Sequence, residues 1–183
     1  MDKTQYVIIG AGIIGLAVAR KLARAGHKVI VLEKNSRVGQ EISFRNSAVI
    51  HAGIYYPQDS LKARLCLPGR EALYQYCEQH HVAYKKTGKL MVATDDNQLA
   101  ALRQLENQAK KNGVVDITWL STVQAQALEP NIVCEAALLS PSSGIVNGAA
   151  LMLSLQQEVI EYGGNIYLDC PLIAGEVLSS GSQ

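Results

Sequence analysis

The sequence lacks an excess of either charge. It has 17 lysine and arginine residues against 16 aspartate and glutamate residues, a formal net charge of +1, and no segment in which basic residues gather. Nucleic-acid-binding surfaces depend on such clusters, so no nucleic-acid partner is expected. Aromatic residues are few, at 5%, but the apolar fraction of 48% is sufficient for a hydrophobic core.

Long hydrophobic runs and metal-binding patterns are also missing. The longest uncharged apolar run ends at Ala19, contains three glycines and is shorter than the roughly 20 residues that span a bilayer. No small-residue cleavage site precedes Arg20, so we expect no signal peptide. The cysteines form no CxxC pair and the histidines no HExxH pattern. We therefore expect no metal site and a cytoplasmic location; the cysteines are Cys66, Cys77, Cys134 and Cys170.

The N-terminal segment has the pattern of a βαβ unit. Residues 6–9 are a β-branched apolar run typical of a buried parallel strand, and 13–25 favour a helix that ends at Gly26. A second strand is predicted over 28–33. The connection between the first strand and the helix is therefore a candidate ligand-binding turn.

That connection has the sequence Gly10-Ala11-Gly12-Ile13-Ile14-Gly15, a GxGxxG motif. Gly10 permits a tight turn, Gly12 lets the backbone approach a pyrophosphate, and Gly15 allows close packing of helix and strand. The N-terminus of the helix supplies free N–H groups and partial positive charge to phosphates. The motif in this context predicts a dinucleotide site.

Glu33 ends the second predicted strand, 18 residues after Gly15. A carboxylate there accepts hydrogen bonds from the adenosine ribose hydroxyls and repels a 2′-phosphate, which disfavours NADP. The spacing does not distinguish FAD from NAD. The predicted cofactor-binding residues of this unit are Gly10, Gly12, Ile14, Gly15, Glu33 and Lys34.

Helices and strands also alternate along the remaining chain. Residues 35–57 show no helical period and are predicted to form a long loop. Pro68 interrupts the helix predicted over 61–79, which we expect to be kinked or divided. Two strands over 84–94 are expected to turn at Thr87-Gly88. The other expected elements are helices from Asp95 or Asp96 to Gly113, from Ser121 to before Pro130 and over 149–162, and strands over 117–120, 136–139, 165–168 and 172–177.

The loop contains Arg45-Asn46-Ser47-Ala48-Val49-Ile50-His51-Ala52-Gly53-Ile54-Tyr55-Tyr56-Pro57. Together with SLKARLC at 60–66, GKL at 88–90 and SGIV at 143–146, this segment resembles the L-2-hydroxyglutarate dehydrogenase/oxidase-like flavoproteins of the D-amino-acid-oxidase superfamily. The resemblance covers essentially the whole chain and implies FAD as the cofactor. It also implies an α/β fold, in which a Rossmann-like FAD/NAD(P)-binding domain with a parallel sheet is interrupted by an α+β substrate domain.

The resemblance implies a division of the chain into three segments. Residues 1–83 would form the first FAD-binding segment, 84–144 part of the substrate domain, and 145–183 the returning FAD-binding segment. The strand over 165–168 would lie beside the strand that carries Glu33. Members of the family are much longer, so we expect the chain to be truncated, without the C-terminal half that completes both sites.

The resemblance further implies roles for residues of the loop. In such relatives the turn Arg45-Asn46-Ser47 lies along the FAD diphosphate and the edge of the flavin, and His51 lies close to the flavin ring. Oxidation of a 2-hydroxy acid transfers a hydride to the flavin and a proton to a base, for which histidine has a suitable pKa. His51 is thus the candidate catalytic base. The alternative is a histidine that only orients the flavin or satisfies a loop carbonyl.

Other residues of the segment are weaker candidates. Tyr55 and Tyr56 either line the substrate pocket or only pack. Lys62, Arg64 and Lys89 either attract a carboxylate substrate or are solvated. The chain departs from the family pattern at Phe44, where relatives usually carry a small residue, and at Ala48, where glycine or glutamate is expected.

Three functions stay open at this point. The first is an FAD-dependent oxidoreductase acting on a small 2-hydroxy acid such as L-2-hydroxyglutarate. The second is an enzyme of the same superfamily that acts on an amino acid, an imino acid or a glycerol phosphate. The third is a catalytically inactive, truncated dinucleotide-binding fragment. Four further questions also stay open. They are the electron acceptor (oxygen or quinone), covalent tethering of FAD, homo-oligomer formation, and peripheral association of the full-length enzyme with the inner membrane.

Overall fold

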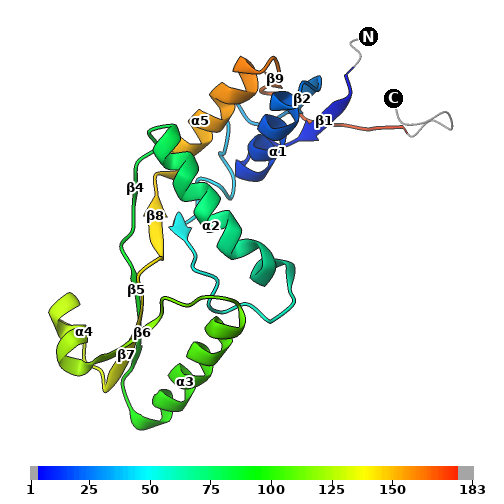
Figure 1. Ribbon diagram of the computed structural model, residues 1–183. Coiled ribbons are helices and arrows are strands. Elements are labelled where there is room, and N and C mark those ends of the chain that lie inside the picture. Colours follow the sequence, from blue (N-terminus) through cyan, green and yellow to red (C-terminus); the bar gives the residue numbers. More distant parts are fainter. Residues whose placement is uncertain (1–3, 177–183) are drawn as a thin grey trace. The chain divides into compact units, whose positions relative to one another are not determined.

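The computed structural model describes residues 4–176, in which the chain forms two compact units (Figure 1). The first unit combines residues up to Ser47 with those from Asn147 onward, and the second comprises Ala48–Val146. Residues 48–83 therefore lie in the second compact unit. The predicted segments 1–83, 84–144 and 145–183 were defined by the ligand that each part binds, not by compactness. This division by ligand stays a prediction.

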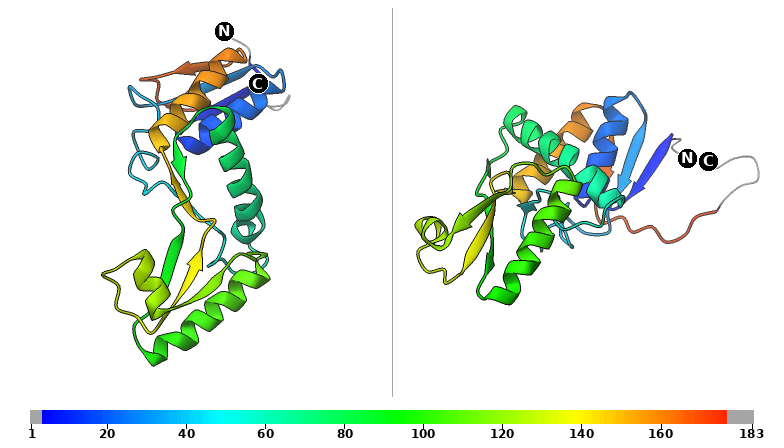
Figure 2. Two further views of the ribbon diagram at one scale, coloured as in Figure 1. Left: turned by 60° about the vertical axis from the view of Figure 1, so that its left-hand side comes forward. Right: turned by 60° about the horizontal axis from the view of Figure 1, so that its bottom comes forward.

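The first unit is a parallel sheet covered by two helices. The strands are hydrogen-bonded in the order β1-β2-β9, so β9 lies beside β2 as predicted. Figures 1 and 2 show the two helices side by side. Their contact buries leucine, alanine and valine side chains, as expected for apolar stripes with helical period. The elements are β1 (Tyr6–Ile9), α1 (Ile13–Arg24), β2 (Val29–Leu32), α5 (Gly148–Glu161) and β9 (Asn165–Tyr167).

A buried ion pair also joins α1 to α5. Arg20 Nε donates to Glu158 Oε2 at 2.5 Å, and the two side chains are 18% and 6% exposed. Charged groups in such surroundings need a partner. The pair joins residues that are 138 positions apart in sequence and so fixes how α1 and α5 are aligned along each other.

The second unit contains two three-stranded sheets, with orders β3-β8-β4 and β5-β7-β6, and every strand pairing in them is antiparallel. The elements are β3 (Val49–Ile50), α2 (Leu61–Gln79), β4 (Tyr84–Lys85), β5 (Lys89–Ala93), α3 (Asp96–Lys111), β6 (Thr118–Ser121), α4 (Thr122–Leu128), β7 (Ala136–Ser140) and β8 (Gly144–Val146).

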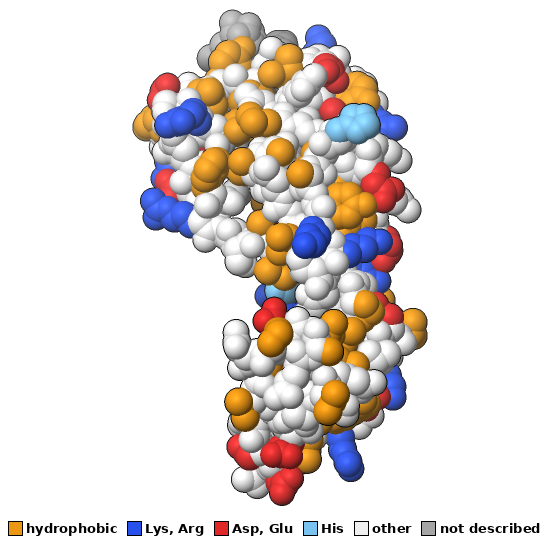
Figure 3. Space-filling view, turned by 90° about the vertical axis from the view of Figure 1, so that its left-hand side faces the viewer, with side chains coloured by type: hydrophobic (Ala, Val, Ile, Leu, Met, Phe, Trp, Pro, Cys, Tyr) orange, Lys and Arg blue, Asp and Glu red, His pale blue; other side chains and the backbone are white. Residues whose placement is uncertain are grey.

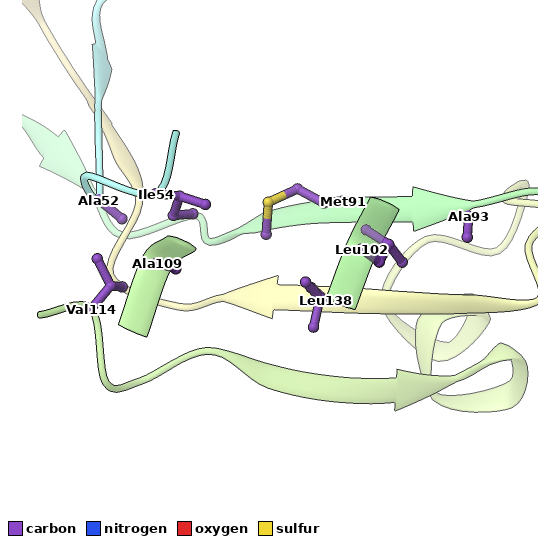
Figure 4. Close-up of a cluster of buried hydrophobic side chains, with 8 residues drawn as sticks. All are labelled: Ala52, Ile54, Met91, Ala93, Leu102, Ala109, Val114 and Leu138. Carbon is purple, nitrogen blue, oxygen red and sulfur yellow. The ribbon is translucent and has the colours of Figure 1, made fainter. Parts of the chain in front are cut away.

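The sheet β5-β7-β6 has a core on each face because strand side chains alternate in direction. Met91 and Ala93 of β5 join Leu138 of β7 in a cluster with Leu102 and Ala109 of α3 (Figure 4). Figure 4 also shows side chains of the segment after β3 at one end of this cluster. The opposite face packs against α4, through Leu90, Val92, Leu120, Ala125, Ile132, Cys134 and Ala137.

Several predicted elements need correction. The loop predicted over 35–57 contains β3, and the turn predicted at 141–144 leads into β8; strands of two or three residues are too short to show a period. β4 and β5 do not form a hairpin, because they belong to different sheets. Residues 172–176 form no strand, and Val177 lies outside the described residues.

Helix α2 continues through Pro68, so of the two expected outcomes, a kink or a division, the division is wrong. A proline inside a helix costs about 3 kcal/mol through a lost hydrogen bond and a steric clash. Buried side chains on both sides of Pro68, Ala63 before it and Tyr74 and Cys77 after it, hold the two halves in one helix. Tertiary packing therefore outweighs the local preference.

Candidate cofactor and substrate site

The glycine turn between β1 and α1 has the predicted geometry. Gly10 has φ +96°, which favours glycine, and its N–H donates to Leu32 O at 2.7 Å. A Cβ atom on Gly15 would lie 2.0 Å from Gly10 O, so only glycine permits this contact between turn and helix. The turn thus brings the N-terminus of α1 to the end of the parallel sheet.

The N-terminus of α1 is largely free to bind an anion. Gly12 is the N-cap residue and provides no side-chain cap, and the N–H groups of Ile14 and Gly15 find no acceptor among the described residues. Ile13 N–H donates to Ser43 Oγ at 3.0 Å. Sequence reasoning missed Ser43; the available signal was a hydroxyl two residues before the turn Arg45-Asn46-Ser47.

Glu33 directly follows β2 and is buried. Its Oε2 accepts from Ala11 N–H at 2.7 Å, and its Oε1 accepts from the backbone and side-chain N–H groups of Asn35 at 2.9 and 2.8 Å. A carboxylate has about four acceptor positions, so about one remains for a ribose hydroxyl. Free N–H donors at the start of α1 and the buried carboxylate after β2, which accepts from Ala11 of the glycine turn, fit the diphosphate and ribose of FAD.

The remaining predicted cofactor residues lie in the segment that follows Glu33. Lys34 Nζ forms an exposed ion pair with Glu41 Oε1 at 3.0 Å, and this ammonium group lowers the pKa of Glu41. Arg45, Asn46 and Ser47 are exposed and end the N-terminal segment of the first unit. Arg45 N–H donates to Ile42 O at 3.1 Å, which closes a turn just before them.

Phe44 and Arg45 line a pocket of about 540 Å³ against α5. Met152 and Leu153 form part of its apolar wall, and Arg37 contributes a second cation. The residues of the glycine turn do not line this pocket. Figure 3 shows other hydrophobic side chains on the surfaces of both units.

Ala48 has φ +54°, a left-handed conformation that favours glycine. Glycine, one of the two residues expected at this position, would adopt this conformation without strain. Ala48 O accepts from Val146 N–H at 3.0 Å, so this conformation is held by the start of the sheet β3-β8-β4.

His51 follows β3 and lines a pocket of about 380 Å³ in the second unit. Burial, and next to it the positive charge of Lys89, lower the pKa of His51 below its usual 6.5. Its carbonyl accepts from Cys66 Sγ at 3.4 Å. Burial raises the pKa of Cys66, so the thiol stays protonated near neutral pH. The pocket is lined by His51, Tyr56, Leu61, Lys62, Leu65 and Cys66.

Both tyrosines lie beside lysines. Lys89 Nζ is 4.6 Å from the centroid of the Tyr55 ring, and Lys62 Nζ is 5.9 Å from that of Tyr56. Burial, followed by the influence of Cys66, raises the pKa of Tyr56, which keeps its hydroxyl protonated. The structure thus brings two tyrosines, two lysines and a histidine together within the second unit.

The end of α3 holds this loop in place, which sequence reasoning also missed. Asn112 Nδ2 donates to Gly53 O and to Tyr56 O, both at 2.9 Å, and Gln108 Nε2 donates to Tyr56 O at 2.9 Å. Gly53 has φ +91°. No sequence pattern connects these amides with a loop more than 50 residues earlier.

Neither a metal site nor a membrane span is found in the described part of the chain. Residues 4–176 contain no group of three or more histidine, cysteine, aspartate or glutamate residues placed to hold a metal ion. None of their helices is both long enough and apolar enough to cross a bilayer. The free cysteines are buried or half-buried.

The chain is similar to flavoenzymes in sequence. It is 44% identical to an L-2-hydroxyglutarate dehydrogenase, mitochondrial, of Arabidopsis thaliana over 88% of this chain and 33% of that protein. It is 36% identical to the L-2-hydroxyglutarate dehydrogenase of Escherichia coli over 88% of this chain and 38% of that protein. The chain thus spans between a third and two-fifths of the length of these curated relatives.

The fold is similar to that of solved flavoenzymes. An L-alpha-glycerophosphate oxidase from Mycoplasma pneumoniae with FAD bound superposes with a TM-score of 0.87 at 26% identity, over 92% of this chain and 45% of that one. An L-proline dehydrogenase from P. horikoshii gives a TM-score of 0.87 at 23% identity, over 97% of this chain and 47% of that one, which shows the fold alone.

The family described as FAD dependent oxidoreductase matches residues 5–180, nearly the whole chain. The glycine turn, the buried Glu33 and the parallel sheet agree with this match. The chain therefore belongs to the FAD-dependent oxidoreductases of the D-amino-acid-oxidase type, and FAD is its cofactor.

Proposed function

We propose that the whole protein oxidises a small 2-hydroxy acid, such as L-2-hydroxyglutarate, with FAD as hydride acceptor. The observation that carries this proposal is the identity of 36–44%, over 87–94% of this chain, to proteins named L-2-hydroxyglutarate dehydrogenase. Their names, together with the residue types around His51, favour an oxidation at a CH–OH group.

The first unit would hold the cofactor. The N–H groups at the start of α1 and the turn Gly10–Gly15 would bind the diphosphate, and Glu33 with Lys34 would bind the ribose. Arg45, Asn46 and Ser47 would extend the site along the cofactor. FAD, when bound, supplies the acceptor for the hydride. These assignments rest on the free donors at α1 and on the buried carboxylate of Glu33.

The second unit would provide the base. His51 would take the proton of the substrate hydroxyl, and a pKa below 6.5 keeps its imidazole neutral and able to accept that proton at neutral pH. Tyr55 and Tyr56 would line the pocket, and the raised pKa of Tyr56 keeps its hydroxyl able to donate a hydrogen bond.

The test has two steps. The purified chain is incubated with FAD and desalted, and retained absorbance near about 450 nm shows cofactor binding. L-2-hydroxyglutarate is then added without oxygen, and loss of that absorbance shows reduction. We expect His51→Gln to slow the reduction by about 10²-fold or more and the control His81→Asn to leave it unchanged. Because the chain spans only part of its relatives, the assay is repeated with the full-length protein, and retained flavin there without reduction by any 2-hydroxy acid would contradict the proposed reaction.

A second candidate is an enzyme of the same superfamily for an amino acid, an imino acid or a glycerol phosphate. The likeness to the L-alpha-glycerophosphate oxidase, at a TM-score of 0.87, favours it. A panel of 2-hydroxy acids, amino acids and glycerol phosphate in the same assay decides between the two. A catalytically inactive binding fragment is the third candidate, and it would retain FAD without reduction by any member of the panel.

We further propose that the whole protein works in the cytoplasm or at the periphery of the inner membrane, and that it is a homo-oligomer. The curated relatives from plants and animals carry the word mitochondrial in their names. Fractionation of cells that produce the full-length protein tests the first statement. Size-exclusion chromatography with light scattering tests the second.

A further inference from the structure

The pocket of about 540 Å³ beside α5 has walls that, apart from Arg45, neither proposed site uses. The glycine turn, Glu33 and the residues around His51 do not line it, and all of its lining residues belong to the first unit. Its volume is within the range of about 300–1,000 Å³ that is typical of small-molecule sites. The pocket is therefore a candidate site for a second ligand.

The walls of this pocket are mostly aliphatic. Met152 and Leu153 on α5, Val38 and Leu168 contribute to them, and the Phe44 ring adds one flat surface. Leu153 and Phe44 are 60% and 61% exposed, so two large apolar side chains are open to solvent at the pocket. Apolar side chains gathered at a hollow in the surface are typical of binding sites. An apolar ligand would shield them from water.

Backbone contacts hold the wall that carries Phe44 in place. Gly39 N–H donates to Ala11 O at 3.0 Å, and Gly39 O accepts from Phe44 N–H at 3.0 Å. A Cβ atom on Gly39 would overlap Met152 Sδ, so glycine lets this segment pack directly on α5. The wall is thus formed before a ligand arrives, which lowers the entropic cost of binding.

Arg37 adds a positive charge to this apolar pocket. Its guanidinium forms neither an ion pair nor a hydrogen bond with any of residues 4–176. Arg45 also lines the pocket, but it is already a predicted cofactor residue, so only the charge of Arg37 is assigned here. The planar guanidinium fork matches a carboxylate. The pocket is therefore complementary to a ligand with an apolar body and a carboxylate head.

We propose that this pocket binds a medium-chain fatty acid, with the carboxylate on Arg37 and the hydrocarbon chain along Met152, Leu153 and Phe44. The aliphatic walls favour a hydrocarbon chain over an aromatic body, for which Phe44 alone provides a stacking surface. The inference goes beyond the proposed function, because it concerns a different pocket and no step of the oxidation uses it.

The test compares octanoate with octan-1-ol, its uncharged counterpart with the same number of carbons. The chain has three methionines, so labelling their methyl groups with ¹³C gives one NMR reporter in the pocket, Met152, and one in the core of the second unit, Met91. Octanoate should shift the Met152 signal and leave that of Met91 unchanged, both without FAD and at saturating FAD. We expect octanoate to bind at least about tenfold more tightly than octan-1-ol, since a charge-assisted hydrogen bond contributes about this much.

Arg37→Gln should remove most of the preference for octanoate and leave the affinity for octan-1-ol unchanged. Arg103→Gln is the matched control, because Arg103 is exposed on α3 and does not line this pocket. Leu153→Ser should weaken both ligands alike, since it removes part of the apolar wall that the chain covers. A two-dimensional amide spectrum of each variant separates a loss of binding from a loss of folding.

Three results would overturn the inference. The first is no shift of the Met152 signal with octanoate, or a preference for octanoate that persists in Arg37→Gln. The second is a shift that saturating FAD abolishes, because the pocket would then belong to the cofactor site. The third is co-sedimentation with phosphatidylglycerol vesicles without any response to octanoate, which would assign the surface to a membrane. Each result leaves the proposed function as it stands, since the test involves no 2-hydroxy acid.

Discussion

At the scale of single residues, three positions show how local conformation and charge prepare the site. Ala48 adopts a conformation that favours glycine, His51 is kept neutral by its surroundings, and Glu33 is fixed by three hydrogen bonds. The first two lead to measurable consequences for stability and for titration.

Replacement of Ala48 by glycine should stabilise the chain. A non-glycine residue in the left-handed region costs roughly 1–2 kcal/mol, and glycine removes this strain. Glycine also loses up to about 1 kcal/mol more backbone entropy on folding than alanine does, so the net gain in stability is about 0.5–1 kcal/mol. Urea unfolding measures it. Ala83→Gly is the control, since Ala83 is exposed and has no positive φ, and it should be destabilising. A loss of stability in Ala48→Gly would contradict the argument.

The titration of His51 should reflect burial and Lys89. Its folded-state pKa lies below 6.5, so the unfolded state binds more protons and His51 favours folding above about pH 6.5. This contribution is lost as the pH falls through the folded-state pKa. NMR titration should give a pKa below 6.5 that rises in Lys89→Met and stays unchanged in Lys86→Met. A His51 pKa above 6.5 would refute the assignment of burial as the main cause.

At the scale of elements, the register of each unit depends on a few polar contacts that cross long stretches of sequence. The pair Arg20–Glu158 connects α1 with α5, and Asn112 at the end of α3 connects with the loop after β3. Both are buried or half-buried, so loss of one partner removes a hydrogen bond that water replaces poorly.

Glu158→Ala should destabilise the first unit by about 3 kcal/mol, because it leaves the Arg20 guanidinium half-buried without its carboxylate. The double variant Arg20→Met/Glu158→Leu should recover most of this loss. Glu41→Gln, which removes the exposed pair with Lys34, should leave the urea midpoint unchanged. Equal effects of Glu158→Ala and Glu41→Gln would show that the buried pair has no special role.

Asn112→Ala should loosen the loop that carries His51. It removes two hydrogen bonds to loop carbonyls and should cost about 1–2 kcal/mol. Hydrogen exchange at residues 51–56 should be faster in this variant. Asn107→Ala, on the exposed side of the same helix, is the control and should leave the loop unchanged. Slow exchange of the loop in both variants would argue that packing alone fixes it.

At the scale of the whole molecule, the two compact units divide the proposed work: cofactor binding in the first and substrate binding in the second. Two distant chain segments form the first unit, and the continuous segment between them forms the second. Binding of FAD should therefore protect one part of the chain selectively.

Saturating FAD should slow hydrogen exchange at residues 10–16 and 33–47, with little effect on β5 and β7. At a concentration 100 times Kd, a ligand stabilises the segment that binds it by about 2.7 kcal/mol. Exchange with mass spectrometry measures the protection, and ADP is a comparison ligand that should protect the glycine turn alone. Uniform protection of both units, or none at the glycine turn, would contradict this division.

The sequence by itself determined the local parts of this protein. The GxGxxG turn, its flanking strand and helix, and Glu33 follow from spacing within 30 residues, because Gly10 is required by its positive φ and Gly15 by its close contact with Gly10 O. The helices were predicted to within a few residues, because their apolar stripes are long enough to show a period.

Only the tertiary structure decided which elements meet. β8 lies between β3 and β4, although two- and three-residue strands carry no pattern that names a partner. Lys89 reaches Tyr55, and Asn112 reaches Tyr56, across 34 and 56 residues of sequence. Hydrophobic periodicity specifies the type of an element and its buried face, whereas the partner of that face is selected by packing of the whole chain.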